Sequence, residues 1–110
     1  MTHGEIWTID FGQPVGSLPS KIRPAVVMQN DLLGIKHLNT VVVIPFTSNL
    51  VSSEHEPNIF FTKEETGLSK DSVAVIHLIG AANKFCFERK ISKLSEENYQ
   101  KLIDAVVKLI

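Results

Sequence analysis

The chain has 110 residues, with 11 Lys and Arg against 12 Asp and Glu, for a formal net charge of -1. A hydrophobic fraction of 44% and a charged fraction of 21% are typical of an ordinary globule, and the length predicts a single domain over residues 1–110. These totals exclude a large basic surface, so any site for nucleic acid has to be local, with a few cations converging in a groove.

The cysteine content and the hydropathy pattern indicate the cellular compartment of the protein. Cys86 is the single cysteine and excludes an internal disulfide, so a reducing cytosol is acceptable. Residues 1–5 lack the basic and apolar regions of a secretory signal. The longest apolar run, residues 41–46, is far too short to span a bilayer and contains a proline. We therefore expect a cytoplasmic protein with no membrane contact.

The first predicted element is a strand over residues 5–11, where polar and apolar side chains alternate. Its predicted core face carries Trp7, Ile9 and Phe11. Residues 12–21 contain two Gly, two Pro and two Ser, which predicts a loop. Long loops in small domains are often functional.

The second strand is predicted over residues 24–29, after a basic segment that ends at Arg23. Pro24 has no N–H, which favours the first position of that strand, and it holds Arg23 in an extended conformation. Arg23 is thus a cation on a stiffened backbone at the mouth of a buried strand. The local pattern fits a fixed anion clamp, and it also fits an arginine that covers the rim of the core and pairs with a carboxylate.

The middle of the chain predicts further short strands. A third strand over residues 40–46 is followed by Thr47, Ser48 and Asn49, which also suit a hydrogen-bonded turn. The remaining elements are predicted as a fourth strand over 58–61, one helical turn over 63–66 stopped by Gly67, a fifth strand over 72–78, a break over 80–83 and weak alternation over 85–91.

The clearest helix is predicted at the end of the chain, with Ser95 as its N-cap and acidic residues in its first turn. Its apolar stripe comprises Tyr99, Leu102, Ile103, Val106, Val107 and Ile110. Either the sheet or a second copy of the chain has to cover that stripe. The fold class is therefore mostly β, a small antiparallel sheet, curled or barrel-like, with a C-terminal helix packed on it.

The chemistry suggested by the residues is metal-free. The four histidines show no ligand spacing and Cys86 reads as a packed thiol, so we expect no metal and no cofactor. If the second and third strands pair antiparallel, Arg23 and the hydroxyls of Thr47 and Ser48 meet at one edge of the sheet. A guanidinium beside hydroxyl donors suits a phosphodiester. RNA supplies its own nucleophile, the 2′-OH, and the expected products are a cyclic phosphate and a 5′-OH.

Four motifs occur in a familiar order, at residues 4–7, 15–17, 23–27 and 45–48. In them and in its C-terminal helix the chain resembles the MazF/PemK family of toxin endoribonucleases. The resemblance implies an SH3-like small barrel, a homodimer, and ribosome-independent cleavage of single-stranded RNA at a short sequence. It also implies a MazE-like antitoxin whose disordered tail occupies the RNA groove.

The resemblance also implies roles for individual residues. Arg23 matches the family's catalytic arginine and Thr47 its catalytic hydroxyl residue. We also predict five substrate-binding residues, which the resemblance does not match one by one: Ser17, Lys21, Ser48, Asn49 and His77. His77 lies in the stretch 76–83, where many members carry an acidic residue or an Arg-Thr pair, and it would serve here as the titratable group.

Two other functions fit the same fold. The CcdB-type gyrase poisons share it but use a C-terminal tail with Trp-Gly, whereas this chain ends in Leu109-Ile110 and has Trp7 as its one tryptophan. A catalytically weakened toxin that acts by binding is the other alternative, and the altered 76–83 stretch keeps it open. Fold alone does not separate these functions.

Overall fold

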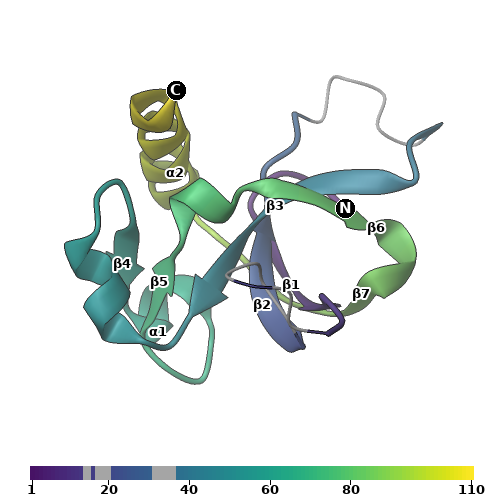
Figure 1. Cartoon of the computed structure of the whole chain (residues 1–110), viewed down its shortest axis with the longest axis horizontal. Coiled ribbons are helices and arrows are strands. Elements are labelled where there is room, and N and C mark those ends of the chain that lie inside the picture. The colour runs from purple at the N-terminus through teal and green to yellow at the C-terminus, as the bar shows by residue number, and fades with distance from the viewer. Residues whose placement is uncertain (14–15, 17–20, 31–36) are drawn as a thin grey trace.

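The computed structural model describes residues 1–13, 16, 21–30 and 37–110, and in them a curled β-sheet carries one long helix (Figure 1). The strands are β1 (Glu5–Asp10), β2 (Ile22–Val27), β3 (Thr40–Thr47), β4 (Ile59–Phe61), β5 (Ser72–Ala74), β6 (Gly80–Asn83) and β7 (Phe87–Lys93). The helices are α1 (Lys63–Thr66) and α2 (Glu96–Leu109), with 3-10 segments η3 (Leu50–Glu54), η4 (Ile76–Leu78) and η5 (Lys84–Cys86).

Strand β3 organises the sheet because it pairs with three other strands. The order is β4-β5-β3-β2-β1-β7, all antiparallel, and β6 pairs with the first half of β3. The last two residues of β3, Phe46 and Thr47, pair with β5 instead. Figure 1 shows the chain passing from β6 to β7 on the side of the molecule away from α2. In the part of the chain that the structure describes, β6 and β7 share no ladder, so the expected barrel is a curled sheet that stays open.

Hydrophobic residues fill both faces of the central strands. The cluster under α2 includes Ile6, Val26 and Ile44, and the cluster inside the curl includes Ile9 and Val27. The predicted single core face of the first strand is therefore incomplete. On the predicted core face, Ile9 is fully buried, and Trp7 and Phe11 are half-buried. Ile6 on the opposite face is fully buried as well. The reason is that α2 covers one face while the sheet curls over the other.

The C-terminal helix forms as predicted. The Ser95 hydroxyl caps α2 by accepting a hydrogen bond from the N–H of Asn98 at 3.1 Å. Leu102 is fully buried, whereas Val107 is 69% exposed and Ile110 is 96% exposed, so the predicted stripe was too wide. Val107 lies nine positions after the buried Asn98, about two and a half turns, and therefore on the opposite side of the helix.

The strand boundaries differ from the prediction most clearly over residues 72–83 and at the start of β2. The predicted strand 72–78 ends after Ala74 and continues as η4, while residues 80–83, predicted to break the pattern, form β6. The chain has to cross here from β5 at the end of β3 to β6 beside its first half, and the small residues of β6 gave no periodic signal. Strand β2 begins at Ile22 rather than at Pro24; its pairing with β3 starts only at Ala25, so Pro24 lies beyond that ladder.

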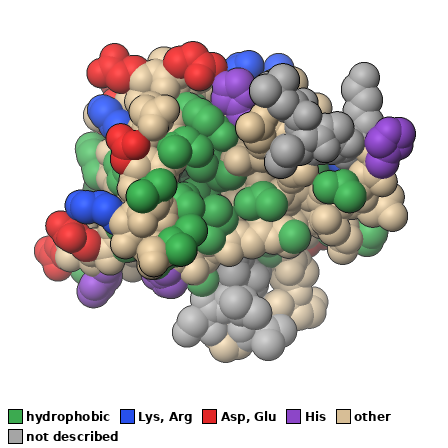
Figure 2. Space-filling view, turned by 90° about the horizontal axis from the view of Figure 1, so that it is seen from above, with side chains coloured by type: hydrophobic (Ala, Val, Ile, Leu, Met, Phe, Trp, Pro, Cys, Tyr) green, Lys and Arg blue, Asp and Glu red, His purple; other side chains and the backbone are tan. Residues whose placement is uncertain are grey.

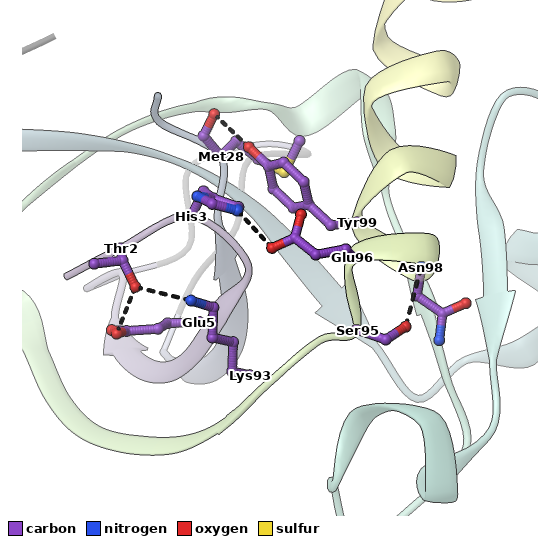
Figure 3. A network of polar contacts seen from close by, with 9 residues as sticks. All are labelled: Thr2, His3, Glu5, Met28, Lys93, Ser95, Glu96, Asn98 and Tyr99. Atoms are coloured by element: carbon purple, nitrogen blue, oxygen red, sulfur yellow. Dashed lines mark hydrogen bonds and ion pairs between the residues drawn. The ribbon is translucent and has the colours of Figure 1, made fainter. Parts of the chain in front are cut away.

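The N-terminal residues are attached to the start of α2 by the polar network in Figure 3. His3 Nε2 lies 2.9 Å from Glu96 Oε1, and the His3 ring packs on the ring of Tyr99 at a centroid distance of 4.7 Å. The Tyr99 hydroxyl donates a hydrogen bond to the Met28 carbonyl oxygen at 3.2 Å. These contacts join three segments that are far apart in the sequence.

Glu5 is a buried carboxylate with three partners. It accepts hydrogen bonds of 2.9 Å from both the Trp7 indole and the Thr2 hydroxyl, and the Lys90 ammonium lies 3.5 Å away. Burial raises the pKa of Glu5, but these partners outweigh it, so the pKa lies below its ordinary value of 4.5. Glu5 is therefore a paired, structural charge.

Candidate active site

A pocket of about 380 Å³ opens where the start of β2, the end of β3 and the turn before β5 meet. Its lining combines cations, hydroxyls and apolar side chains. The lining residues are Lys21, Arg23 and Lys70, then Thr47, Ser48, Ser69 and Ser72, and finally Ile22, Pro24, Phe46 and Leu68. No Asp or Glu is among these lining residues, so the charge of the pocket wall is positive.

Strand order explains why these residues meet. Strand β3 lies between β2 and β5. The last pair of the β2–β3 ladder is Ala25 with Pro45. Arg23 and Thr47 each lie two residues beyond that pair, and both line the pocket. On the other side of β3, Thr47 pairs with Val73 of β5. Thr47 therefore lies in the middle of the pocket, with β2 on one side and the start of β5 on the other.

Thr47 is half-buried and its side chain is held by the turn that follows β3. Its Oγ1 accepts a hydrogen bond from the backbone N–H of Asn49 at 3.1 Å. That bond uses an acceptor site of the hydroxyl and leaves its proton out of the interaction. A hydroxyl with a fixed oxygen and a proton to donate suits a phosphoryl oxygen, and the Arg23 guanidinium can neutralise the charge on that group.

Lys21 has a left-handed backbone, with φ of 58°, which is uncommon for a residue other than glycine. Two backbone hydrogen bonds to the residues that follow β1 hold it, from Phe11 N to Lys21 O at 2.8 Å and from Lys21 N to Gly12 O at 2.6 Å. Such a conformation costs on the order of 1–3 kcal/mol and persists only where the surroundings enforce it. The strain places a lysine at the rim of the pocket.

The structure brings together four of the seven residues singled out in the sequence: Lys21, Arg23, Thr47 and Ser48. Asn49 instead caps η3, where its Oδ1 accepts from the N–H of Val51 at 3.3 Å. Ser17 lies outside the residues that the structure describes.

His77 is exposed on η4 and lines a different pocket, of about 300 Å³, together with Phe11, Val43 and residues 78–81. The structure does not bring it to Arg23. The strand expected over residues 72–78 would have carried His77 to a strand end, but the chain turns into η4 after Val75.

Sequence reasoning missed the third wall of the pocket, made by Leu68, Ser69, Lys70 and Ser72. The one signal was a polar turn between the predicted stop at Gly67 and the next strand. Nothing local showed that this turn would lie beside the end of β3.

In residues 1–13, 16, 21–30 and 37–110, no three His, Cys, Asp or Glu side chains gather in a way that could hold a metal ion. Over the same ranges, none of the helices has both the length and the apolar character that crossing a membrane requires.

A curled antiparallel sheet with a C-terminal helix and a cationic, hydroxyl-lined pocket at its edge defines a small β domain with a pocket suited to an anion. The chain belongs to the family of PemK-like, MazF-like toxins of type II toxin-antitoxin systems, which matches residues 2–110. The resemblance seen in the four sequence motifs is thereby confirmed.

Named relatives agree with this family. The chain is 36% identical over 84 residues to the endoribonuclease MazF2 of Mycobacterium bovis, covering 76% of this chain and 74% of that protein. It is 28% identical over 106 residues to the endoribonuclease MazF of Staphylococcus saprophyticus, covering 96% of this chain and 88% of the relative.

Solved structures share the fold. The Mycobacterium tuberculosis toxin MazF-mt6 superposes with a TM-score of 0.69 at 20% identity, covering 94% of this chain and 93% of that one. A mycobacterial endoribonuclease solved with its cognate antitoxin gives a TM-score of 0.72 at 14% identity, covering 98% and 90%. These structures support the mostly β class with a C-terminal helix.

Proposed function

We propose that this chain is the toxin of a type II toxin–antitoxin system and cuts single-stranded RNA at a short sequence, without a metal ion and without the ribosome. The expectation of an endoribonuclease agrees with the names of its relatives. One observation carries the proposal for this chain, the convergence of Arg23 with Thr47 and Ser48 in a pocket lined by cations and no carboxylate.

The proposed reaction uses groups that RNA already holds. The ribose 2′-OH attacks the adjacent phosphorus, the bond from phosphorus to the 5′ oxygen breaks, and the products are a 2′,3′-cyclic phosphate and a 5′-OH. Negative charge grows on the phosphoryl oxygens in the transition state. Arg23 stabilises that charge and does not act as a base, because a guanidinium keeps its proton in proteins. The Thr47 hydroxyl donates to a phosphoryl oxygen and orients the group.

The other predicted contacts are assigned by position. Lys21 and Ser48 contact the RNA backbone at the pocket rim. Ser17, in the matching motif 15–17, and Asn49, next to Ser48, are also proposed as substrate contacts. His77 contacts the RNA away from the scissile phosphate, in the second pocket, and changes charge near neutral pH.

A homodimer is proposed from the end of α2, where Val107, Leu109 and Ile110 are exposed. Figure 2 shows hydrophobic side chains gathered on the face from which α2 projects in Figure 1, with acidic side chains at one rim. A second copy would cover these residues. We expect Val107→Asp to weaken self-association at least about tenfold in sedimentation velocity, because a carboxylate would be buried unpaired. A wild-type monomer at micromolar concentration would contradict the dimer.

The partners follow from the same pocket. We propose that a MazE-like antitoxin covers the RNA groove with a disordered segment, and that the toxin acts in the cytoplasm. A solved mycobacterial endoribonuclease with its cognate antitoxin supports the existence of such a partner. RNA and the antitoxin would then compete for one surface.

Cleavage of a long single-stranded RNA in EDTA tests the proposal. Wild type should give discrete cuts, and Arg23→Ala and Thr47→Ala should lose about 100-fold or more in rate. Arg89→Ala is the matched control because Arg89 is exposed on β7 and does not line the pocket. Thr47→Ser should keep most activity, since the hydroxyl remains. If Arg23→Ala and Thr47→Ala cut like wild type, the site is wrong. Wild-type RNA binding without any cut would instead support the weakened toxin.

A further inference from the structure

Lys70 faces the pocket from the side opposite Arg23. It lies in the turn between α1 and β5 and lines the same pocket as Arg23 and Thr47. Because β3 runs between β2 and β5, Thr47 separates the wall that carries Arg23 from the wall that carries Lys70. Neighbouring strands lie about 4.8 Å apart, so an ideal sheet sets these two walls roughly 10 Å from each other.

The turn that carries Lys70 is held on both sides. The buried Ser72 hydroxyl donates to the Lys70 carbonyl oxygen at 3.1 Å, and Ser72 is itself only 4% exposed. Before the turn, the N–H of Leu68 donates to the Thr66 hydroxyl at 3.1 Å. Gly67 has φ of 75°, and a Cβ there would approach Ser92 Cβ to 3.0 Å, so this backbone path depends on glycine.

The one carboxylate in that turn is engaged elsewhere. Asp71 Oδ1 accepts a hydrogen bond of 2.8 Å from the backbone N–H of Lys63, in the first turn of α1. It is not among the lining residues of the pocket. Lys70 is therefore a cation on a fixed backbone whose neighbouring acid points to a helix.

The size of the pocket indicates what the two cationic walls hold. Sites for small molecules span about 300–1,000 Å³, so a pocket of about 380 Å³ takes roughly one nucleotide unit. A nucleotide unit within an RNA chain has a phosphate at each end. With the scissile phosphate at Arg23 and Thr47, the next phosphate of the chain falls at the opposite wall.

We propose that Lys70 binds the backbone phosphate next to the scissile one, so that the pocket grips one nucleotide by both of its phosphates. The inference rests on the proposed ribonuclease function. A lysine suits this task because its ammonium is a point charge on a flexible stem, which follows a phosphate without reading a base.

The test pairs a protein variant with a chemically altered substrate. An RNA oligonucleotide that spans a mapped cut site is made with a neutral methylphosphonate at the linkage on the 5′ side of the scissile one, and another with it on the 3′ side. Lys70→Gln should lower kcat/KM on the unmodified RNA about tenfold, the worth of a charged hydrogen bond. One of the two neutral linkages should lower kcat/KM of the wild type by a similar factor. The same linkage should not lower kcat/KM of Lys70→Gln any further.

Three controls separate the outcomes. Lys70→Arg should keep most activity, and Lys101→Gln, which removes an exposed lysine of α2 outside this pocket, should cut like wild type. The salt dependence of binding should be shallower for Lys70→Gln, by about 0.7 in the slope of log K against log salt concentration.

Two results would overturn the role of Lys70. One is full activity of Lys70→Gln. The other is that each neutral linkage lowers kcat/KM by the same factor in Lys70→Gln as in wild type. The ribonuclease proposal would still stand if Arg23→Ala is inactive in the same assay. Wild-type cleavage by Arg23→Ala would instead overturn the proposed function itself, and the role of Lys70 with it.

Discussion

Polar side chains are arranged differently in two regions of the molecule. One is the junction between the N-terminus and α2, and the other is the pocket at the end of β3. At the junction, His3 faces Glu96 and the Tyr99 hydroxyl is bonded to a backbone oxygen (Figure 3). In the pocket, three cations share the wall with hydroxyls and no carboxylate. The contacts at the junction join segments of the chain and stabilise the fold, whereas cations gathered on one wall of a pocket favour the binding of an anion. The comparison separates contacts that join distant segments of the chain from side chains that gather around a pocket.

The largest expected effect is in the pocket. Arg23→Lys keeps the charge but loses the planar fork that matches a phosphate, so we expect about a 100-fold lower kcat/KM. The midpoint of thermal unfolding should change little, because the lysine keeps the positive charge at this position. Cleavage assays and thermal unfolding of the same samples measure both. A large loss of thermal stability would place Arg23 among the structural residues and break the contrast.

A smaller effect is expected at the junction. Tyr99→Phe removes the hydrogen bond to the Met28 carbonyl, which is worth about 1 kcal/mol of unfolding free energy. RNA cleavage by the folded variant should equal that of wild type, since the junction does not line the pocket. Urea unfolding gives the free energy, and single-turnover cleavage gives the rate. A slower rate at unchanged stability would mean that the two regions are coupled.

The smallest effect concerns Glu5 and pH. Its pKa is lowered in the folded chain, so its carboxylate stabilises the fold fully above the ordinary value of 4.5. That contribution is lost as the pH falls through the lowered pKa. Glu5→Gln should therefore be less stable than wild type at pH 7, and the two should converge at pH values well below 4.5. A difference in unfolding free energy that stays constant across this range would show that the charge of Glu5 is not what matters.

The helix and the first half of the site were predictable because their signals are local or depend on one register. Ser95 and the acidic residues after it mark the start of α2 without any tertiary contact. Arg23 and Thr47 meet because antiparallel pairing of two consecutive strands brings the start of one to the end of the other. It was harder to predict that both faces of the first strand are buried, since burial depends on what covers each side of the sheet.

The sequence by itself determined the strand-rich class, the capped C-terminal helix, the family and the meeting of Arg23 and Thr47 at one pocket. Only the tertiary structure decided that β3 is shared between β2 and β5, which brings Lys70 to the pocket and carries His77 to another one. Periodicity and capping act within one element, whereas a pocket wall is built by segments whose contact depends on how the whole sheet curls and branches.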